Sequence, residues 1–173
     1  MTGRGRAIVL IGFMGSGKSS TGRALARKTG WPRFDTDESV SQRFGRDIAE
    51  IFSEFGEERF RDAETEALRE LSGVAPSIIV TGGGIVLRPE NVELLRRLGT
   101  LVHLEADEET LFQRVSRRTT RPLLQTEDPR GTLAKLLRER EPIYREAADF
   151  KVDTSRLTRE EVAEAVLRSM ESL

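Results

Sequence analysis

The sequence predicts an α/β protein with a five-stranded parallel sheet, helices on both faces of the sheet, and a single domain over residues 1–173. Short apolar runs alternate with longer amphipathic stretches along the chain, as in sheets built from crossover connections. A glycine-rich stretch separates the first apolar run from the first helical pattern. A length of 173 residues suffices for one hydrophobic core and is too short for two typical domains.

The apolar runs are the predicted strands. Short runs bounded by turn residues are typical of buried strands. They span residues 7–11, 31–35, 77–81, 100–104 and 150–153.

The amphipathic stretches are the predicted helices. One helix follows the first strand and extends through Leu25, and Gly45 ends a helix over residues 38–44. Asp107 is the predicted N-cap of a helix that extends to Arg117, and Thr158 opens a capping box for the last helix. Further helices are expected at 47–55, 57–72, 89–97 and 130–147. Apolar stripes predict inward-facing Phe60, Ala63, Ala67 and Leu71, and Val162, Ala165, Val166 and Met170 in the last helix.

Residues 118–129 contain two prolines and no apolar periodicity, which predicts a loop. Loops of that length are uncommon unless they are functional. The flanking region is rich in arginine, which gives two interpretations: an ordinary solvated face, or a lid over about residues 114–129. A lid would exclude water and bring an arginine beside Pro122 onto a triphosphate. The arginines concerned are Arg114, Arg117, Arg118 and Arg121.

The composition excludes several classes of protein. With 28 basic and 29 acidic residues, the chain lacks the charge excess typical of nucleic-acid or anionic-membrane binding. The absence of cysteine excludes a disulfide scaffold, a thiol nucleophile and a thiolate zinc site. The sequence shows no apolar run long enough for a membrane span and no signal-peptide pattern. We therefore expect a cytoplasmic protein with small-molecule partners.

The clearest motif is Gly-Phe-Met-Gly-Ser-Gly-Lys-Ser at residues 12–19, hereafter the P-loop, which fits the pattern G-x-x-x-x-G-K-[ST] in full. Its glycines let backbone N–H groups converge on an anion, and the following helix N-terminus adds about half a positive charge. Lys18 supplies a charge for the outer phosphates, and the Ser19 hydroxyl can ligate Mg²⁺. The alternative is a glycine-rich turn without a ligand; the strand–loop–helix context favours nucleotide phosphates.

Two further stretches follow predicted strands. Asp35 and Asp37 could divide the work of phosphoryl transfer, one toward a water on Mg²⁺ and the other toward the acceptor hydroxyl. The alternative is that Thr36 or Asp37 caps the next helix. Residues 82–84 are three glycines, which form either a strand-ending turn or a bare backbone surface for a substrate. Because the carboxyl ends of parallel strands face one crevice, we expect both stretches beside the P-loop.

Two arginines lie on or beside apolar helix stripes. Arg140 continues the stripe that contains Leu133 and Leu137, where a guanidinium is costly unless it meets an anion. Arg61 lies beside an inward stripe, with Glu64 one turn further on to hold its guanidinium in place. A structural ion pair or a partly exposed guanidinium would explain either arginine alone. Together they suit bidentate capture of a substrate carboxylate.

His103, Trp31 and Tyr144 are not expected to take part in catalysis. His103 lies in a predicted strand and is expected to be structural rather than a general base. Trp31 and Tyr144 are expected to pack in the interior.

As a set, these residues resemble the shikimate kinase family, small P-loop enzymes of aromatic amino-acid biosynthesis, and the resemblance covers essentially the whole chain. It rests on GFMGSGKSS at 12–20, FDTD at 34–37, FRDAE at 60–64, GGG at 82–84, RPLL at 121–124 and REPIY at 140–144. The resemblance implies a three-layer P-loop kinase fold with a lid loop. It also implies that ATP phosphorylates the hydroxyl at carbon 3 of shikimate, with Mg²⁺ as the cofactor.

The resemblance assigns roles by position. It implies nucleotide binding by Met14, Gly15, Ser16, Gly17, Lys18, Ser19, Arg117, Arg121 and Arg156, the last beside the adenine. It implies shikimate binding by Asp37, Arg61, Gly82, Gly83, Gly84 and Arg140, with the arginines at the carboxylate. Lys18, Asp37 and Arg121 are the implied catalytic residues, and Ser19 and, through water, Asp35 the metal-binding residues.

Two other functions remain open at this point. One is another P-loop kinase, acting on gluconate or a nucleotide; a substrate without a carboxylate would leave Arg61 and Arg140 without a ligand. The other is a nucleotide-dependent regulatory protein, which would not need Asp37 beside two inward arginines. We expect shikimate and ATP as partners, no nucleic acid, no membrane, and a monomer.

Overall fold

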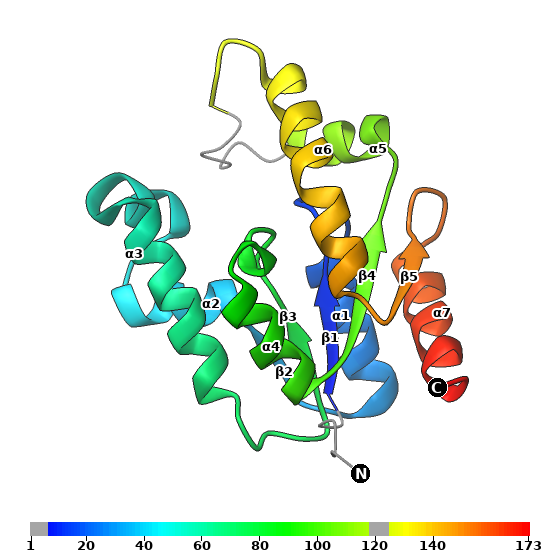
Figure 1. Cartoon of the computed structure of the whole chain (residues 1–173). Helices are drawn as coiled ribbons and strands as arrows, with labels where there is room; N and C mark the ends of the chain where they lie inside the picture. Colours follow the sequence, from blue (N-terminus) through cyan, green and yellow to red (C-terminus); the bar gives the residue numbers. More distant parts are fainter. Residues whose placement is uncertain (1–6, 118–124) are drawn as a thin grey trace.

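The computed structural model describes residues 7–117 and 125–173. Within them, five strands form one parallel sheet in the order β2-β3-β1-β4-β5, shown in Figure 1. The strand order reverses at β1, which lies between β3 and β4. Ligands bind beyond the carboxyl ends of the strands at such a point. The strands are β1 (Ala7–Ile11), β2 (Arg33–Asp35), β3 (Ser77–Val80), β4 (Gly99–Glu105) and β5 (Phe150–Asp153).

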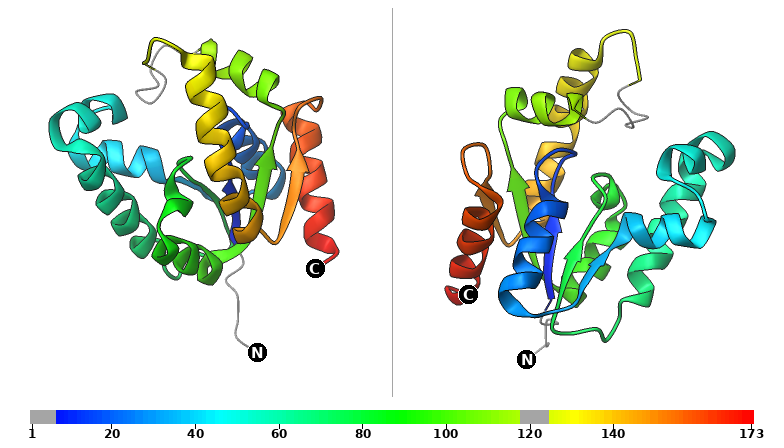
Figure 2. Two further views of the ribbon diagram at one scale, coloured as in Figure 1. Left: turned by 45° about the horizontal axis from the view of Figure 1, so that its top comes forward. Right: turned by 180° about the vertical axis from the view of Figure 1, so that it is seen from behind.

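Helices connect the strands and cover both faces of the sheet (Figure 2). They are α1 (Lys18–Thr29), α2 (Thr36–Phe44), α3 (Ile48–Glu70), the short 3₁₀ helix η1 (Ile85–Leu87), α4 (Pro89–Leu98), α5 (Glu108–Ser116), α6 (Pro129–Ala147) and α7 (Arg159–Glu171). The predicted α/β class and parallel sheet with helices on both faces are confirmed.

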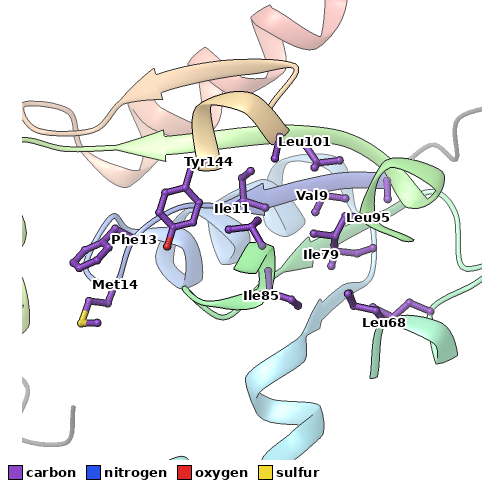
Figure 3. Close-up of a cluster of buried hydrophobic side chains, with 14 of the residues drawn as sticks. Val9, Ile11, Phe13, Met14, Leu68, Ile79, Ile85, Leu95, Leu101 and Tyr144 are labelled. Atoms are coloured by element: carbon purple, nitrogen blue, oxygen red, sulfur yellow. The ribbon is translucent and has the colours of Figure 1, made fainter. Parts of the chain in front are cut away.

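Alternating side chains of the strands face two separate cores. On one face, Ile8 and Leu10 of β1 pack with Leu25 of α1 and Val166 of α7. On the other face, residues from β1, β3 and β4 pack with α3, α4 and α6 (Figure 3). This second cluster includes Val9, Ile11, Ile79, Leu101, Leu68, Leu95 and Tyr144. The two clusters produce the three layers that the resemblance implies.

Helices α2 and α3 form an arm with its own small core, made by Val40, Ile51 and Phe60. The chain breaks helical geometry inside α3 at Gly56, where φ is 82°. The two helices predicted at 47–55 and 57–72 are therefore present, and they meet at this glycine. The arm lies beside the sheet edge that carries β2, as Figure 1 shows.

Several boundaries differ from the expectation. The second strand begins at Arg33 rather than residue 31, and η1, which follows the glycines, was not predicted. The predicted lid at 114–129 overlaps two helices, because α5 continues to Ser116 and α6 begins at Pro129. Arg118 and Arg121 lie outside the described residues. Among the described helices, none combines the length and apolar character that crossing a bilayer requires.

Candidate active site

The N-terminus of α1 is built to receive an anion. Among the α-helices that the structure describes, it alone has neither a capping side chain nor an acidic residue in its first turn. Its cap is Gly17, in the left-handed region at φ 93°. Because the first N–H groups of a helix need acceptors and carry partial positive charge, an uncapped N-terminus suits phosphate.

Lys18 folds back over the P-loop. Its Nζ donates to the carbonyl oxygens of Gly12 at 2.7 Å and Phe13 at 2.9 Å, and the residue is 8% exposed. Gly15, within the P-loop, has φ 80°. The P-loop therefore keeps one ammonium group against its own backbone.

Arg114 of α5 and Thr154, which follows β5, both bond to the P-loop. Arg114 donates to the carbonyl of Gly15 at 3.2 Å and to the carbonyl of Thr154 at 2.9 Å. The Thr154 hydroxyl in turn donates to the carbonyl of Ser16 at 3.1 Å. Arg114 is thus a support for the P-loop within α5, rather than part of a loop.

A cavity of about 370 Å³ opens over the P-loop. Its lining confirms that the residues of the predicted phosphate cradle lie together and that Arg117 faces the same space. Arg156 is exposed and is not among the lining residues, although its neighbours Thr154 and Leu157 are. The lining includes Met14, Gly15, Ser16, Gly17, Lys18, Ser19, Asp35, Asp37, Arg114 and Arg117.

Asp35 caps α2, so the alternative interpretation, in which Thr36 or Asp37 is the cap, is wrong. Its Oδ1 accepts from the backbone N–H of Asp37 at 3.0 Å and of Glu38 at 3.3 Å. Both capping bonds use the same carboxylate oxygen, and Asp35 also lines the cavity. Burial raises the pKa of Asp35 despite these bonds, because a buried carboxylate loses hydration.

The oxygen groups in this cavity fit a magnesium ion. Ser19 contributes a hydroxyl and Asp35 a carboxylate, both in the lining. Mg²⁺ prefers oxygen ligands, keeps several of its waters and takes few protein ligands. The donor set therefore agrees in chemistry with the residues predicted for the metal.

A second, smaller cavity of about 70 Å³ adjoins the first. Arg61 and Arg140 both line it, from α3 and α6, together with Glu64. Its apolar wall comes from Ile48, Phe52 and Phe60 of the arm. The structure thus brings together two cations and an apolar surface, which suits a small ring with a carboxylate.

Arg61 is held by two acids. Its Nη1 donates to Oε2 of Glu64 at 2.8 Å, and its Nη2 donates to Oε1 of Glu57 at 3.2 Å. Burial opposes the charge of Arg61, but both acids favour it and raise its pKa. Burial raises the pKa of Glu64 to about 7, although Arg61 acts in the opposite direction. The predicted role of Glu64 in holding Arg61 is confirmed.

Arg140 differs from Arg61 in its partners. It is 5% exposed, and among the described residues no acidic side chain forms an ion pair with it. Glu64 interacts with Arg140 electrostatically but is bonded directly to Arg61, and a buried cation without a direct ion pair is unfavourable in a folded protein. Arg140 is therefore the stronger candidate for meeting an anionic ligand.

The glycines at 82–84 leave space that neighbouring side chains occupy. A Cβ on Gly82 would lie 2.6 Å from Oδ1 of Asp37 and 2.8 Å from Oε1 of Glu64. A Cβ on Gly84 would overlap the guanidinium of Arg61. Gly83 is less crowded, since its nearest neighbour would be the backbone N of Met14 at 3.4 Å. Two of the glycines are thus required by the residues that line the second cavity.

The two cavities share part of their walls, which Met14, Asp37, Gly82 and Gly83 form. A ligand in one cavity therefore lies next to a ligand in the other. Asp37 faces both spaces, as a residue between a phosphate donor and an acceptor must.

Comparisons with known proteins agree with this arrangement. A family model described as shikimate kinase matches residues 14–171. A shikimate kinase from Thermodesulfovibrio yellowstonii is 47% identical over 166 residues, covering 96% of this chain and 95% of that protein. One from Cupriavidus pinatubonensis is 45% identical over 164 residues, covering 95% and 85%. The chain belongs to the shikimate kinase family.

A solved structure supports the same assignment. The shikimate kinase from Acinetobacter baumannii in complex with shikimate superposes with a TM-score of 0.93 and 36% identity, covering 96% of this chain and 93% of that one. The P-loop kinase fold implied by the sequence is confirmed.

Sequence reasoning missed one polar contact in this shikimate kinase. Tyr144 was expected only to pack, and its ring does pack, fully buried and stacked on His103 with centroids 5.2 Å apart. Its hydroxyl also donates to the carbonyl of Gly83. The Arg-x-Pro-x-Tyr spacing placed Tyr144 one turn after Arg140, but nothing in the local pattern indicated Gly83 as its partner.

His103 is structural, as expected. It is 1% exposed, and burial lowers its pKa to about 4. The imidazole is therefore neutral at physiological pH. It belongs to the layer beneath α6 and lines neither cavity.

Proposed function

We propose that this shikimate kinase transfers the γ-phosphoryl group of ATP to the 3-hydroxyl of shikimate, giving shikimate 3-phosphate and ADP. The observation that carries this proposal is the shared wall of the two cavities. The phosphate cradle lines one cavity, Arg61 and Arg140 line the other, and Asp37 lines both. The A. baumannii relative, named as a complex with shikimate, supports the choice of acceptor.

On the donor side, the backbone amides from Gly15 to Ser19 hold the phosphates at the N-terminus of α1. The uncapped first turn supports this role, because its N–H groups have no competing side-chain acceptor. Lys18 exchanges its bonds to the Gly12 and Phe13 carbonyls for phosphate oxygens. It then stabilises negative charge on the transferring group.

The Ser19 hydroxyl and, through water, Asp35 would hold Mg²⁺. When bound, the ion neutralises charge on the phosphate oxygens. Asp35 can serve through its second carboxylate oxygen, which lies 3.5 Å from Nη1 of Arg33, since Oδ1 is used in capping α2.

On the acceptor side, the carboxylate of shikimate is bound by Arg140 and Arg61. The burial of Arg140 without a direct ion pair among the described residues supports its role. Glu64 fixes the direction of the Arg61 guanidinium, which is a planar fork with a defined orientation. The apolar wall of the arm suits the carbon ring.

Asp37 accepts a hydrogen bond from the 3-hydroxyl and directs its oxygen toward the phosphate cradle. Phosphoryl transfer through a loose transition state needs alignment and charge stabilisation more than a strong base. The position of Asp37 in the first turn of α2, next to the capping residue, holds it at the shared wall.

Three arginines complete the proposal on the nucleotide side. Arg117 faces the donor cavity and flanks the adenine, and Arg156 borders the same region. Arg121, outside the described residues, contacts the transferred phosphate from the lid. These roles, together with the single domain, the monomeric state and the cytoplasmic location, stay predictions from the sequence.

A coupled assay of ADP release tests the function. The expected result is turnover with ATP and shikimate that requires Mg²⁺ and stops when EDTA removes it. A panel with gluconate and nucleoside monophosphates separates this proposal from other P-loop kinases. ATP hydrolysis that no acceptor stimulates would instead indicate a nucleotide-dependent regulatory protein.

A further inference from the structure

We propose that Tyr144 is a positioning residue of the acceptor pocket: its hydroxyl holds the Gly83 carbonyl and thereby fixes the glycine turn that separates the two cavities. This inference rests on the proposed function, because it assumes that the second cavity binds the acceptor. Tyr144 itself lines neither cavity, so it acts through Gly83.

The hydroxyl of Tyr144 is well suited to be a permanent donor. The residue is fully buried, and its ring is fixed between His103 and the core of Figure 3. Burial raises the pKa of Tyr144 to about 12, so the phenol stays protonated. A buried hydroxyl needs partners: this one donates to the Gly83 carbonyl and accepts from the Arg140 guanidinium. Because Tyr144→Phe removes both bonds, hydrogen exchange at the glycines is the readout that isolates the bond to Gly83.

The glycine turn needs such an anchor because it has no side chains of its own. Its other bonds are at Gly82, whose N–H donates to the Thr36 hydroxyl at 3.1 Å and whose carbonyl accepts from the N–H of Ile85 at 3.2 Å, and at the Gly84 carbonyl, which accepts from the N–H of Leu87 at 3.1 Å. None of these bonds is made by the peptide group between Gly83 and Gly84, which consists of the Gly83 carbonyl and the Gly84 N–H. Glycine has more backbone freedom than any other residue, so this peptide would otherwise reorient easily.

Fixing one carbonyl fixes the whole peptide group. The peptide is planar and trans, so the N–H of Gly84 must point away from the Gly83 carbonyl. Gly83 also contacts the P-loop, because a Cβ on it would lie 3.4 Å from the backbone N of Met14. The hydroxyl of Tyr144 therefore sets the surface that the acceptor meets and its spacing from the phosphate cradle.

The test is Tyr144→Phe, which keeps the ring and its packing and removes only the hydroxyl. We expect the acceptor KM to rise by about 5-fold, corresponding to one hydrogen bond, with the ATP KM changed less than about 2-fold. The matched control is Ser77→Ala. It removes another buried hydroxyl bond to a backbone carbonyl, from Ser77 to Val74 at 2.7 Å, at the far end of β3.

A purely structural role predicts a different result. If Tyr144→Phe behaved like Ser77→Ala, with a lower melting temperature and an unchanged ratio of the two KM values, the inference would be overturned. Amide hydrogen exchange at residues 82–84 gives a second readout that does not depend on activity. Exchange at these amides should be faster in Tyr144→Phe than in the wild type, and equal exchange would also overturn the inference.

Arg140→Ala, measured in parallel, separates this inference from the proposed function. An effect of Arg140→Ala on the acceptor KM without one of Tyr144→Phe overturns the positioning role alone. If shikimate were not phosphorylated by the wild type, the proposed function would fail. The hydrogen-exchange comparison would still decide whether Tyr144 orders the turn.

Discussion

The Nη1 atom of Arg61 donates to Oε2 of Glu64 at 2.8 Å in the wall of the second cavity, and the side chain of Glu64 is completely buried. Arg61 also reaches Glu57, whose side chain is 55% exposed. The two acids therefore act differently on the same guanidinium. The buried one fixes its direction, while the exposed one contributes little because water screens it.

Glu64→Ala should raise the acceptor KM by about 10-fold, because a bond to a charged group is worth about 1.5–3 kcal/mol. Glu64→Gln keeps an oxygen acceptor and should have a smaller effect. Glu57→Ala is the control and should leave both KM values near those of the wild type. Equal effects of Glu57→Ala and Glu64→Ala would contradict the distinction between the two acids.

Arg140→Ala should raise the acceptor KM more than 10-fold and the ATP KM far less. The reason is the loss of a charge-assisted bond of about 1.5–3 kcal/mol to the acceptor carboxylate. Arg138→Ala, at an exposed position on the same helix, controls for the loss of a guanidinium from α6. Steady-state kinetics with each substrate varied in turn make the comparison. Equal rises in both KM values would show that Arg140 is structural.

Lys18→Met should abolish turnover while the fold persists. The substitution removes the one ammonium that lies over the P-loop among the described residues. Methionine keeps an unbranched side chain similar in length to the hydrocarbon part of lysine. Circular dichroism and thermal melting would confirm folding, and the coupled assay would measure turnover. Lys28→Met, on the same helix and paired on the surface with Glu164, should keep wild-type activity. Turnover by Lys18→Met near the wild-type rate would refute the phosphate-binding role.

Gly84→Ala should weaken acceptor binding by displacing Arg61. The backbone of Gly84, at φ −95° and ψ 5°, accepts alanine without strain, so the effect is a steric one on the guanidinium. A double-mutant cycle with Arg61→Ala measures the coupling. Once Arg61 is removed, Gly84→Ala should change the acceptor KM no further. Fully additive effects would mean that Gly84 acts on some other group.

His103 should make stability fall in mild acid. Burial lowers its pKa from the usual 6.5 to about 4 in the folded state, so between these values the unfolded chain binds more protons. This contribution of His103 to stability is complete above pH 6.5 and is lost as the pH falls toward 4, by about 2 kcal/mol between pH 7 and 5. Buried Glu64, with a raised pKa of about 7, acts in the opposite direction over the same range, so urea unfolding must compare the wild type with His103→Gln at each pH. Relative to His103→Gln, which cannot titrate, the wild type should lose about 2 kcal/mol more between pH 7 and 5, and equal slopes would assign the effect to other groups.

Local signals in the sequence were sufficient for most of the fold. The strand at Ala7–Ile11 and the strand at Phe150–Asp153 were predicted with the bounds that the structure has. The capping box at Thr158 and the N-cap at Asp107 were also predicted correctly. These features depend on residues within a few positions of one another, so their physical causes can be read from short stretches of chain.

Capping around β2 was the local feature that the sequence left ambiguous. Thr36 and Asp37 are good capping residues, yet Asp35 takes that position and Thr36 accepts from the N–H of Gly82. The outcome depends on where β2 ends against β3. A short stretch of chain cannot show this, because it is set by pairing with another strand.

By itself, the sequence determined the order of strands and helices, the phosphate-binding loop, and the residue types available for a carboxylate. Only the tertiary structure decided that Gly84 must leave room for Arg61, that Arg140 is buried without a direct ion pair among the described residues, and that Tyr144 bonds to Gly83. The physical reason is range. Periodicity, caps and motifs record interactions between near neighbours, whereas the contacts of Tyr144 with Gly83, 61 positions away, exist only once helices pack on the sheet.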